Sequence, residues 1–161
     1  MNEVNRNDGG WQNSYMRNLF LGNGGTPTEP VENTFLAALP ADLRAEMKSC
    51  TKYSDNIGGT SNPASAVTAT TDYLFLLAEF EVFGIQIKAN TAEQNSQVQY
   101  DYFKAGNSAV AGSWGSPATA LVWWLRSVCA GASTSFCTVR ASGTAYRYAY
   151  HSYGVLPGFC V

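Results

Sequence analysis

The chain has 161 residues, of which 45% are hydrophobic, and its formal net charge is −2. This composition can supply a core, so it argues against a disordered protein, and the length fits one globular domain over residues 1–161. Nucleic-acid-binding domains are usually basic, and no apolar run approaches the roughly 20 residues of a membrane span. We therefore expect neither a nucleic-acid partner nor a membrane span.

The N-terminal third is predicted to hold an arm and three short helices. Residues 1–10 are polar and read as a loop or arm without a signal peptide, so display outside a cell would need virion assembly or a fused module. Asn13 is a candidate cap for a helix through Met16 and Phe20. A second helix with Thr28 as cap should carry apolar residues, namely Val31, Phe35, Leu36 and Leu39, and a third should span 41–47.

The middle of the chain alternates polar loops with apolar elements. Residues 51–71 are rich in Ser, Thr, Gly and Asn, which predicts a long loop. Residues 73–77 read as a buried strand and 78–83 as a turn or short helix. A helix over 90–104, with Thr91 as cap, should turn Val98, Tyr102 and Phe103 inward, and 106–117 should form another loop.

The C-terminal segment opens and closes on apolar runs. Trp123, Trp124 and Leu125 follow Ala120-Leu121-Val122, as in a buried strand. Residues 154–159 pair apolar residues with turn formers, which predicts a returning strand entered by a tight turn. We expect Trp123, Trp124 and Phe159 to be buried on adjacent strands of one small sheet.

Between these runs, small residues alternate with Tyr, Arg and His. So many hydroxyl, guanidinium and imidazole groups cannot all be buried without partners. Tyr, Ser, Gly and Arg are typical of binding surfaces, where Tyr provides a large contact at low entropic cost. The tract of about 127–153 is therefore predicted to display a binding surface whose candidate contacts are Thr138, Arg140, Ser142, Thr144, Tyr146, Arg147, Tyr148, Tyr150, His151 and Tyr153.

The same segment lacks certain amino acids. From Leu125 to Val161 there is no Lys, Glu, Gln, Met or Trp, and none of these has a codon that ends in a pyrimidine. Replacing the two adenines of Asn codons yields Tyr, His, Arg, Ser, Thr, Gly, Ala, Cys and Val, but none of those five. The composition fits a tract diversified at Asn codons, although a Ser/Tyr-rich loop would look similar.

These motifs carry a family resemblance. The segment resembles the variable region of a diversity-generating retroelement target protein, with WWLRS at 123–127 and GV-x-PGF at 154–159. Upstream, Gly9-Gly10-Trp11, Met16-Arg17, residues 39–43, residues 72–77 and residues 81–84 resemble a domain family of gut bacteria and their phages that carries the same signatures. The resemblance implies an α+β protein with the C-type lectin fold of the formylglycine-generating-enzyme type: short helices around small antiparallel sheets, with long loops. Its scaffold residues would be Trp123, Trp124, Arg126, Gly154, Pro157 and Phe159, with Arg126 bonded to backbone or an acidic partner.

The implied function is reversible recognition, with no catalytic residue, metal or cofactor. The ligand would be a host-surface protein or glycan, and a homo-oligomer is compatible with this function. The protein would act in phage or prophage adhesion to a host, on a virion tail, or in display on a bacterial cell surface.

Other chemistries have weaker support. His151 is the only histidine and does not make a triad, and Glu79 and Glu81 read as solvated charges or partners of an arginine. Residues 122–161 contain no Asp, Glu or Asn, which disfavours a calcium-lectin site. A copper oxidase of the formylglycine-generating type would use Cys129 and Cys137, but their spacing does not match that family. A structural virion component is the third reading.

The four cysteines, Cys50, Cys129, Cys137 and Cys160, include no C-x-x-C pair. Buried free thiols are the simplest expectation, and the sequence leaves a disulfide open.

Overall fold

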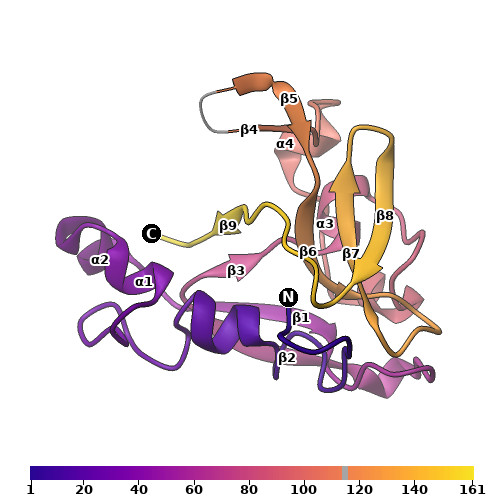
Figure 1. The fold of residues 1–161 in the computed structure, drawn as a ribbon, viewed down its shortest axis with the longest axis horizontal. Coiled ribbons are helices and arrows are strands. Elements are labelled where there is room, and N and C mark those ends of the chain that lie inside the picture. Colours follow the sequence, from indigo (N-terminus) through magenta and orange to yellow (C-terminus); the bar gives the residue numbers. More distant parts are fainter. Residues whose placement is uncertain (114–115) are drawn as a thin grey trace.

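The computed structural model describes residues 1–113 and 116–161, without the side chains at 113, 116–119, 144 and 145. The fold is α+β, with small antiparallel sheets and short helices (Figure 1). The helical elements are η1 (Met16–Phe20), α1 (Phe35–Ala38), α2 (Ala41–Glu46), η2 (Ala64–Ala66), α3 (Glu79–Phe83), η3 (Thr91–Asn95) and α4 (Asp101–Lys104). The strands are β1 (Cys50–Asp55), β2 (Val67–Asp72), β3 (Phe75–Leu76), β4 (Ala111–Ser113), β5 (Ser116–Leu121), β6 (Trp123–Val128), β7 (Ser135–Arg140), β8 (Gly143–Tyr148) and β9 (Pro157–Gly158).

Among the described residues, the strands form four antiparallel sheets: β1–β2, β3–β9, β4–β5 and β6–β7–β8. The three-stranded sheet is formed by the C-terminal segment. In it Trp123 lies opposite Val139 and Trp124 opposite Thr138, and β7 continues into β8 through a two-residue turn between Arg140 and Gly143. Figure 1 shows the β7–β8 hairpin, drawn in orange to yellow, beside β6.

Strand β6 divides two hydrophobic clusters. Because successive side chains of a strand point to opposite faces, Trp123 packs with Val82 and Val139, whereas Trp124 packs with Leu74 and other residues of the larger cluster. Both tryptophans are 1% exposed, which confirms their predicted burial.

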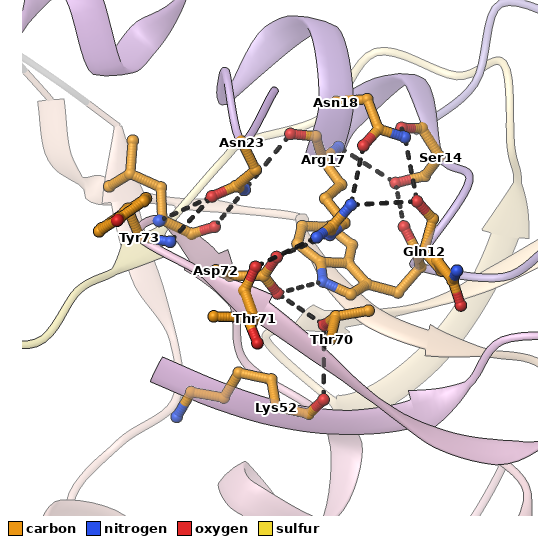
Figure 2. A network of polar contacts seen from close by, with 12 residues as sticks. Gln12, Ser14, Arg17, Asn18, Asn23, Lys52, Thr70, Thr71, Asp72 and Tyr73 are labelled. Atoms are coloured by element: carbon orange, nitrogen blue, oxygen red, sulfur yellow. Dashed lines mark hydrogen bonds and ion pairs between the residues drawn. The ribbon is translucent and has the colours of Figure 1, made fainter. Parts of the chain in front are cut away.

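The N-terminal motifs are joined to β2 by one polar network (Figure 2). Asp72 accepts hydrogen bonds from the Trp11 indole (2.9 Å), the Arg17 guanidinium (2.6 Å) and the Thr70 hydroxyl (2.7 Å). Asn23 accepts from the backbone N–H groups of Tyr73 and Leu74. The motifs at 9–11, 16–17 and 72–77 are therefore held together by hydrogen bonds.

The N-terminal arm packs against the end of the C-terminal tract. The backbone N–H of Asn2 donates to the carbonyl of Ala149 at 2.9 Å. The Asn7 amide is buried and donates to the carbonyls of Ala132 (2.6 Å) and Ser135 (2.9 Å). Residues 1–10 thus lack regular structure, as expected for an arm, but they are held by specific bonds.

A disulfide joins Cys50 of β1 to Cys160, across a sequence separation of 110 residues. Beside it the Lys48 N–H donates to the Cys160 carbonyl, and β9 pairs with β3. The expectation of free thiols is wrong for this pair, and it holds for Cys129 and Cys137, which are buried and unpaired. Sequence spacing could not select the pair, because the chain fold alone brings these two residues together.

The short helices begin later than expected. In the first, Ser14 rather than Asn13 accepts a backbone bond, from the Arg17 N–H. The second covers only α1, because Thr34, not Thr28, accepts the N–H of Ala37. The third, α2, agrees with its prediction to within one residue.

The predicted loop at 51–71 is wrong at its two ends, because residues 51–55 of β1 pair with residues 67–71 of β2. The β-branched threonines of β2 favour an extended strand, and its burial pattern leaves one face largely exposed. The loop at 106–117 is wrong in part, because β4 and β5 lie within or across it; residues 114–115 are outside the described part of the chain.

The predicted helix at 90–104 is interrupted. Asn90, not Thr91, caps η3, and only α4 is helical beyond residue 100. Between η3 and α4 the chain is irregular, and the Tyr100 N–H donates to the Glu81 carbonyl instead of to a helix carbonyl. Phe103 packs against the core as expected, but Val98 (81% exposed) and Tyr102 (60%) point outward.

The apolar elements at 73–83 match their predictions more closely. Leu74, Phe75 and Leu76 are buried, although only Phe75 and Leu76 pair as a strand. Helix α3 follows and ends at Gly84, whose φ of 68° suits glycine.

Candidate functional site

The site is built on β6, whose six residues are all buried. Arg126 is fully buried and donates to both carboxylate oxygens of Glu81 at 2.6 Å each. It also donates to the Leu76 carbonyl at 2.7 Å and the Ser54 hydroxyl at 2.9 Å. The expected role of Arg126, a bond to backbone and to an acidic partner, is confirmed.

The carboxyl groups beneath β6 are bonded to other groups of the protein. Burial alone would raise the pKa of Glu81, but the Arg126 charge and hydrogen bonds outweigh burial and lower it. Burial raises the pKa of Glu93, which accepts a bond from the Ser127 hydroxyl at 2.7 Å. Glu79 accepts the N–H groups of residues 87, 88 and 89 with one oxygen, at 2.8–2.9 Å.

Two predictions about these residues are settled by that geometry. Glu79 and Glu81 are buried, so the reading as solvated charges is wrong, and the reading as an arginine partner is confirmed for Glu81. We call β6 together with Glu79, Glu81 and Glu93 the buried base.

Above the buried base, hairpin β7–β8 and the turn after it expose aromatic side chains. Tyr146, Tyr148 and Tyr150 are 50%, 49% and 52% exposed. The rings of Tyr148 and Tyr150 are stacked, with centroids 6.2 Å apart and an interplanar angle of 6°. The His151 ring meets Tyr150 edge-on at 4.7 Å.

The cluster is anchored to the core at one end. His151 Nδ1 lies 3.2 Å from the Tyr153 hydroxyl, and the Tyr153 ring packs edge-on against Trp124 at 5.3 Å. Because Trp124 belongs to β6, the aromatic cluster continues directly into the buried base.

Two cavities flank these rings. One of about 270 Å³ is lined by Tyr146, Arg147, Tyr148, His151 and Tyr153. The other, of about 390 Å³, is shared by Tyr150, His151 and Tyr153 with residues of the N-terminal region that include Glu3, Tyr15 and Phe20. We call the six residues Tyr146, Arg147, Tyr148, Tyr150, His151 and Tyr153 the tyrosine face.

The other candidate contacts lie apart from the tyrosine face. Arg140 and Ser142 are exposed at the far end of the hairpin, and the side chain of Thr144 is outside the described residues. Thr138 is fully buried, so its assignment to a displayed surface is wrong. It lies on the central strand β7 directly opposite the buried Trp124, so its side chain points to the same face of the sheet as that ring.

The closing motif is also less buried than expected. Gly154 bridges to Trp123 and lies within the fold. Phe159 is 43% exposed, and the adjacent β9 pairs with β3 rather than with β6. The prediction that Phe159 is buried beside the tryptophans in one sheet is therefore wrong.

Sequence reasoning missed the residues that border the tyrosine face from other parts of the chain. The Lys88 ammonium lies 5.8 Å from the Tyr146 ring centroid, and Tyr15 and Phe20 line the second cavity. No local sequence signal connects them to the tract. Within the described parts of the chain, no three His, Cys, Asp or Glu side chains group closely enough to hold a metal ion.

The family model described as "Domain of unknown function (DUF6273)" matches residues 1–161. The chain belongs to this family. The DUF6273 match therefore includes both the buried base and the tyrosine face. No curated protein and no solved structure matches the chain. Among the described residues, no helix of this DUF6273 chain has the length and apolar character needed to cross a bilayer.

Proposed function

We propose that this protein is a ligand-binding protein whose tyrosine face recognises a host-surface protein or glycan. The tract of about 127–153 would be diversified by a retroelement, and the chain would have the C-type lectin fold of the formylglycine-generating-enzyme type. The observation that carries the proposal is the clustering of half-exposed Tyr146, Tyr148 and Tyr150 above a strand that is buried throughout.

The geometry of the rings favours binding. A tyrosine has few rotatable bonds, so fixing it against a ligand costs little entropy. Here the rings of Tyr148 and Tyr150 already stack on each other, and the His151 ring makes edge-on contacts with both. A preorganised aromatic anchor can contribute about 2 kcal/mol or more to binding.

The disulfide supports a place outside the cell. Disulfides such as Cys50–Cys160 persist mainly in oxidising surroundings. A virion tail or a bacterial cell surface provides such surroundings, which agrees with a role in adhesion or display.

The oxidase alternative has less support. Burial raises the pKa of Cys129, and raises that of Cys137 well above its ordinary value. A catalytic cysteine needs the thiolate, whose formation is favoured by a lowered pKa. The environment of these two residues has the opposite effect.

A cell-binding assay tests the recognition role. The labelled protein is incubated with a panel of gut bacteria, and binding is measured by flow cytometry. A variant with Tyr146, Tyr148 and Tyr150 changed to Ser should lose the binding that the parent shows. The matched control changes Tyr102 and Val98, which are exposed elsewhere, to Ser and should bind as the parent does. Equal binding by both variants would place the ligand site elsewhere.

A genomic test addresses the diversification. The DNA beside the gene should encode a reverse transcriptase and a repeat of the tract with adenines at the variable codons. Sequencing a population should show changes confined to codons of residues 127–153. Uniform variation along the gene would contradict the retroelement.

A further inference from the structure

The smaller cavity of the tyrosine face combines aromatic walls with a positive charge. It has a volume of about 270 Å³ and is lined by Tyr146, Arg147, Tyr148, His151 and Tyr153. Arg147 carries the only permanent charge among these described lining residues, and none of them is an Asp or a Glu. The carboxylate of Glu3 belongs to the lining of the neighbouring cavity and not to that of this one. The lining therefore favours a ligand with a negative charge.

Arg147 has the donors to bind such a charge. It is half-buried on β8, and its Nη1 donates to the Tyr146 carbonyl at 2.9 Å. A guanidinium has five N–H donors in a planar fork, so this bond uses only one of them. Arg147 takes part in none of the ion pairs formed by the described residues. A carboxylate matches the fork geometrically, because its two oxygens can accept two parallel hydrogen bonds.

The aromatic walls of the cavity are held in place by contacts within the tyrosine face. The chain turns back after β8, where the His151 N–H donates to the Tyr148 carbonyl at 3.1 Å. The ring of His151 meets those of Tyr148 and Tyr153 edge-on, with centroids 5.8 Å and 5.7 Å apart. These contacts are present without a ligand, so binding against the walls requires little ordering of side chains.

The walls are chemically similar to a sugar. A tyrosine combines an apolar ring with a polar hydroxyl, and a pyranose likewise combines apolar C–H groups on its faces with hydroxyls at its rim. A tyrosine hydroxyl both donates and accepts, as a sugar hydroxyl does. Ligand pockets for drug-sized molecules measure roughly 300–1,000 Å³, and the volume of about 270 Å³ lies just below this range. The cavity therefore suits one sugar unit.

We propose that the tyrosine face of this chain binds a glycan through a sugar that bears a carboxylate, such as a uronic acid. This inference rests on the proposed function, because it names the class of ligand for the same surface. Arg147 pairs with the carboxylate, and the sugar ring lies against the rings of Tyr146 and Tyr148. An Asp or Glu of a protein ligand offers the charge but not the ring of C–H and hydroxyl groups that these walls match.

The experiment is an NMR titration of the intact ¹⁵N-labelled chain with methyl β-D-glucuronide. Backbone signals of residues 146–153 should shift and saturate in the millimolar range, as is usual for so small a ligand. Methyl β-D-glucoside, which has a CH₂OH group in place of the carboxylate, should bind at least about tenfold more weakly, because it loses a hydrogen bond between charged groups. N-acetylglutamate methylamide, which has the carboxylate but no sugar ring, should also bind measurably more weakly. All titrations are made at matched ionic strength.

Variants test the role of Arg147. R147Q should weaken binding of the glucuronide at least about tenfold, whereas R140Q, a matched change of the exposed arginine at the far end of the hairpin, should leave it intact. Absence of saturation, equal binding of the glucoside or of the blocked glutamate, or unchanged binding by R147Q would each overturn the proposal. The comparison of the three ligands uses the unaltered chain, so it stands even if R147Q does not fold.

The cell-binding assay separates this inference from the proposed function. R147Q should lose the binding to cells that the parent shows, and R140Q should keep it. If R147Q binds the cells as the parent does while the variant with three tyrosines changed to Ser does not, the tyrosine face recognises a ligand without an acidic sugar. That result would overturn this inference and leave the proposed function intact. Undiminished binding by both variants would overturn the two together.

Discussion

Strand β6 of the buried base and the tyrosine face are close in the chain, at 123–128 and 146–153, but the polar groups of the two regions are in opposite environments. In the buried base, Arg126 and Glu81 are enclosed and bonded to each other. In the tyrosine face, Tyr146, Tyr148 and Tyr150 are half exposed, and their contacts are mainly with other rings. The difference shows how exposed side chains of one segment can be replaced without loss of the fold: the bonds that hold the fold together are made by residues outside the tyrosine face.

Tyr153 is where the two regions meet. It contacts His151 of the tyrosine face and also packs on Trp124 of the buried base. Within the tyrosine face, substitutions should therefore change from neutral at Tyr146 and Tyr148 to destabilising at this residue.

The largest expected effect is the loss of the buried ion pair. R126M should lower the free energy of unfolding by about 3–5 kcal/mol, because Glu81 remains buried without its partner. Urea denaturation followed by circular dichroism measures this. R140M removes an exposed arginine of the same segment and should change stability by no more than about 0.5 kcal/mol. Equal losses of stability in R126M and R140M would contradict the claim that the buried base, and not the exposed surface, holds the fold together.

The next effect concerns the covalent support of the closing motif. Changing both Cys50 and Cys160 to Ser should lower the free energy of unfolding by about 2–4 kcal/mol, because the unfolded chain gains freedom. The parent protein in reductant should melt at the temperature of this double variant. A parent that is unaffected by reductant would show that the disulfide contributes nothing to stability.

A smaller effect is expected in the pH dependence of stability, where two carboxyl groups of the buried base should act in opposite directions. The pKa of Glu93 is raised above its usual value of 4.5, so its contribution to stability is present below that pH and is lost as the pH rises through the raised pKa. The pKa of Glu81 is lowered, so its contribution is present above 4.5 and is lost as the pH falls.

Unfolding experiments across the acid range measure this difference. As the pH rises from about 4.5 to neutral, the parent should lose stability relative to E93Q. As the pH falls below 4.5, the parent should lose stability relative to E81Q. Parallel pH profiles for all three proteins would contradict both assignments.

The smallest effects are expected on the tyrosine face. Changing Tyr146, Tyr148 or Tyr150 to Ser should each alter the free energy of unfolding by about 0.5 kcal/mol or less. Tyr153 to Ser should cost about 1 kcal/mol or more, because it removes an edge-on contact with Trp124. Thermal melts of the four single variants provide the comparison. A large loss at Tyr146 would mean that the face contributes to the core.

The sequence predicted the base better than the elements that surround it. Trp123, Trp124 and Arg126 could be placed because large apolar residues in an extended run, and an arginine among them, have few solutions other than burial with a partner. The exposure of Tyr146, Tyr148 and Tyr150 followed from the cost of burying so many hydroxyl groups.

The failures have a common cause in long-range pairing. Thr138 resembles its neighbours in sequence, but its strand lies between two others, which no local pattern reveals. The Ser/Thr-rich segment at 51–71 forms strands at its two ends because those ends pair with each other. The helix at 90–104 is broken where Tyr100 and Gln97 donate to the carbonyls of Glu81 and Tyr53, which are distant in sequence.

The bond between Cys50 and Cys160 also determines what a protease can accomplish. The segment it encloses contains the β4–β5 hairpin, the β7–β8 hairpin and the whole tyrosine face. A single cut within this segment opens the backbone but leaves both fragments in one covalent molecule. In the presence of a protease, one cut in this segment would not release the tyrosine face from the rest of the protein.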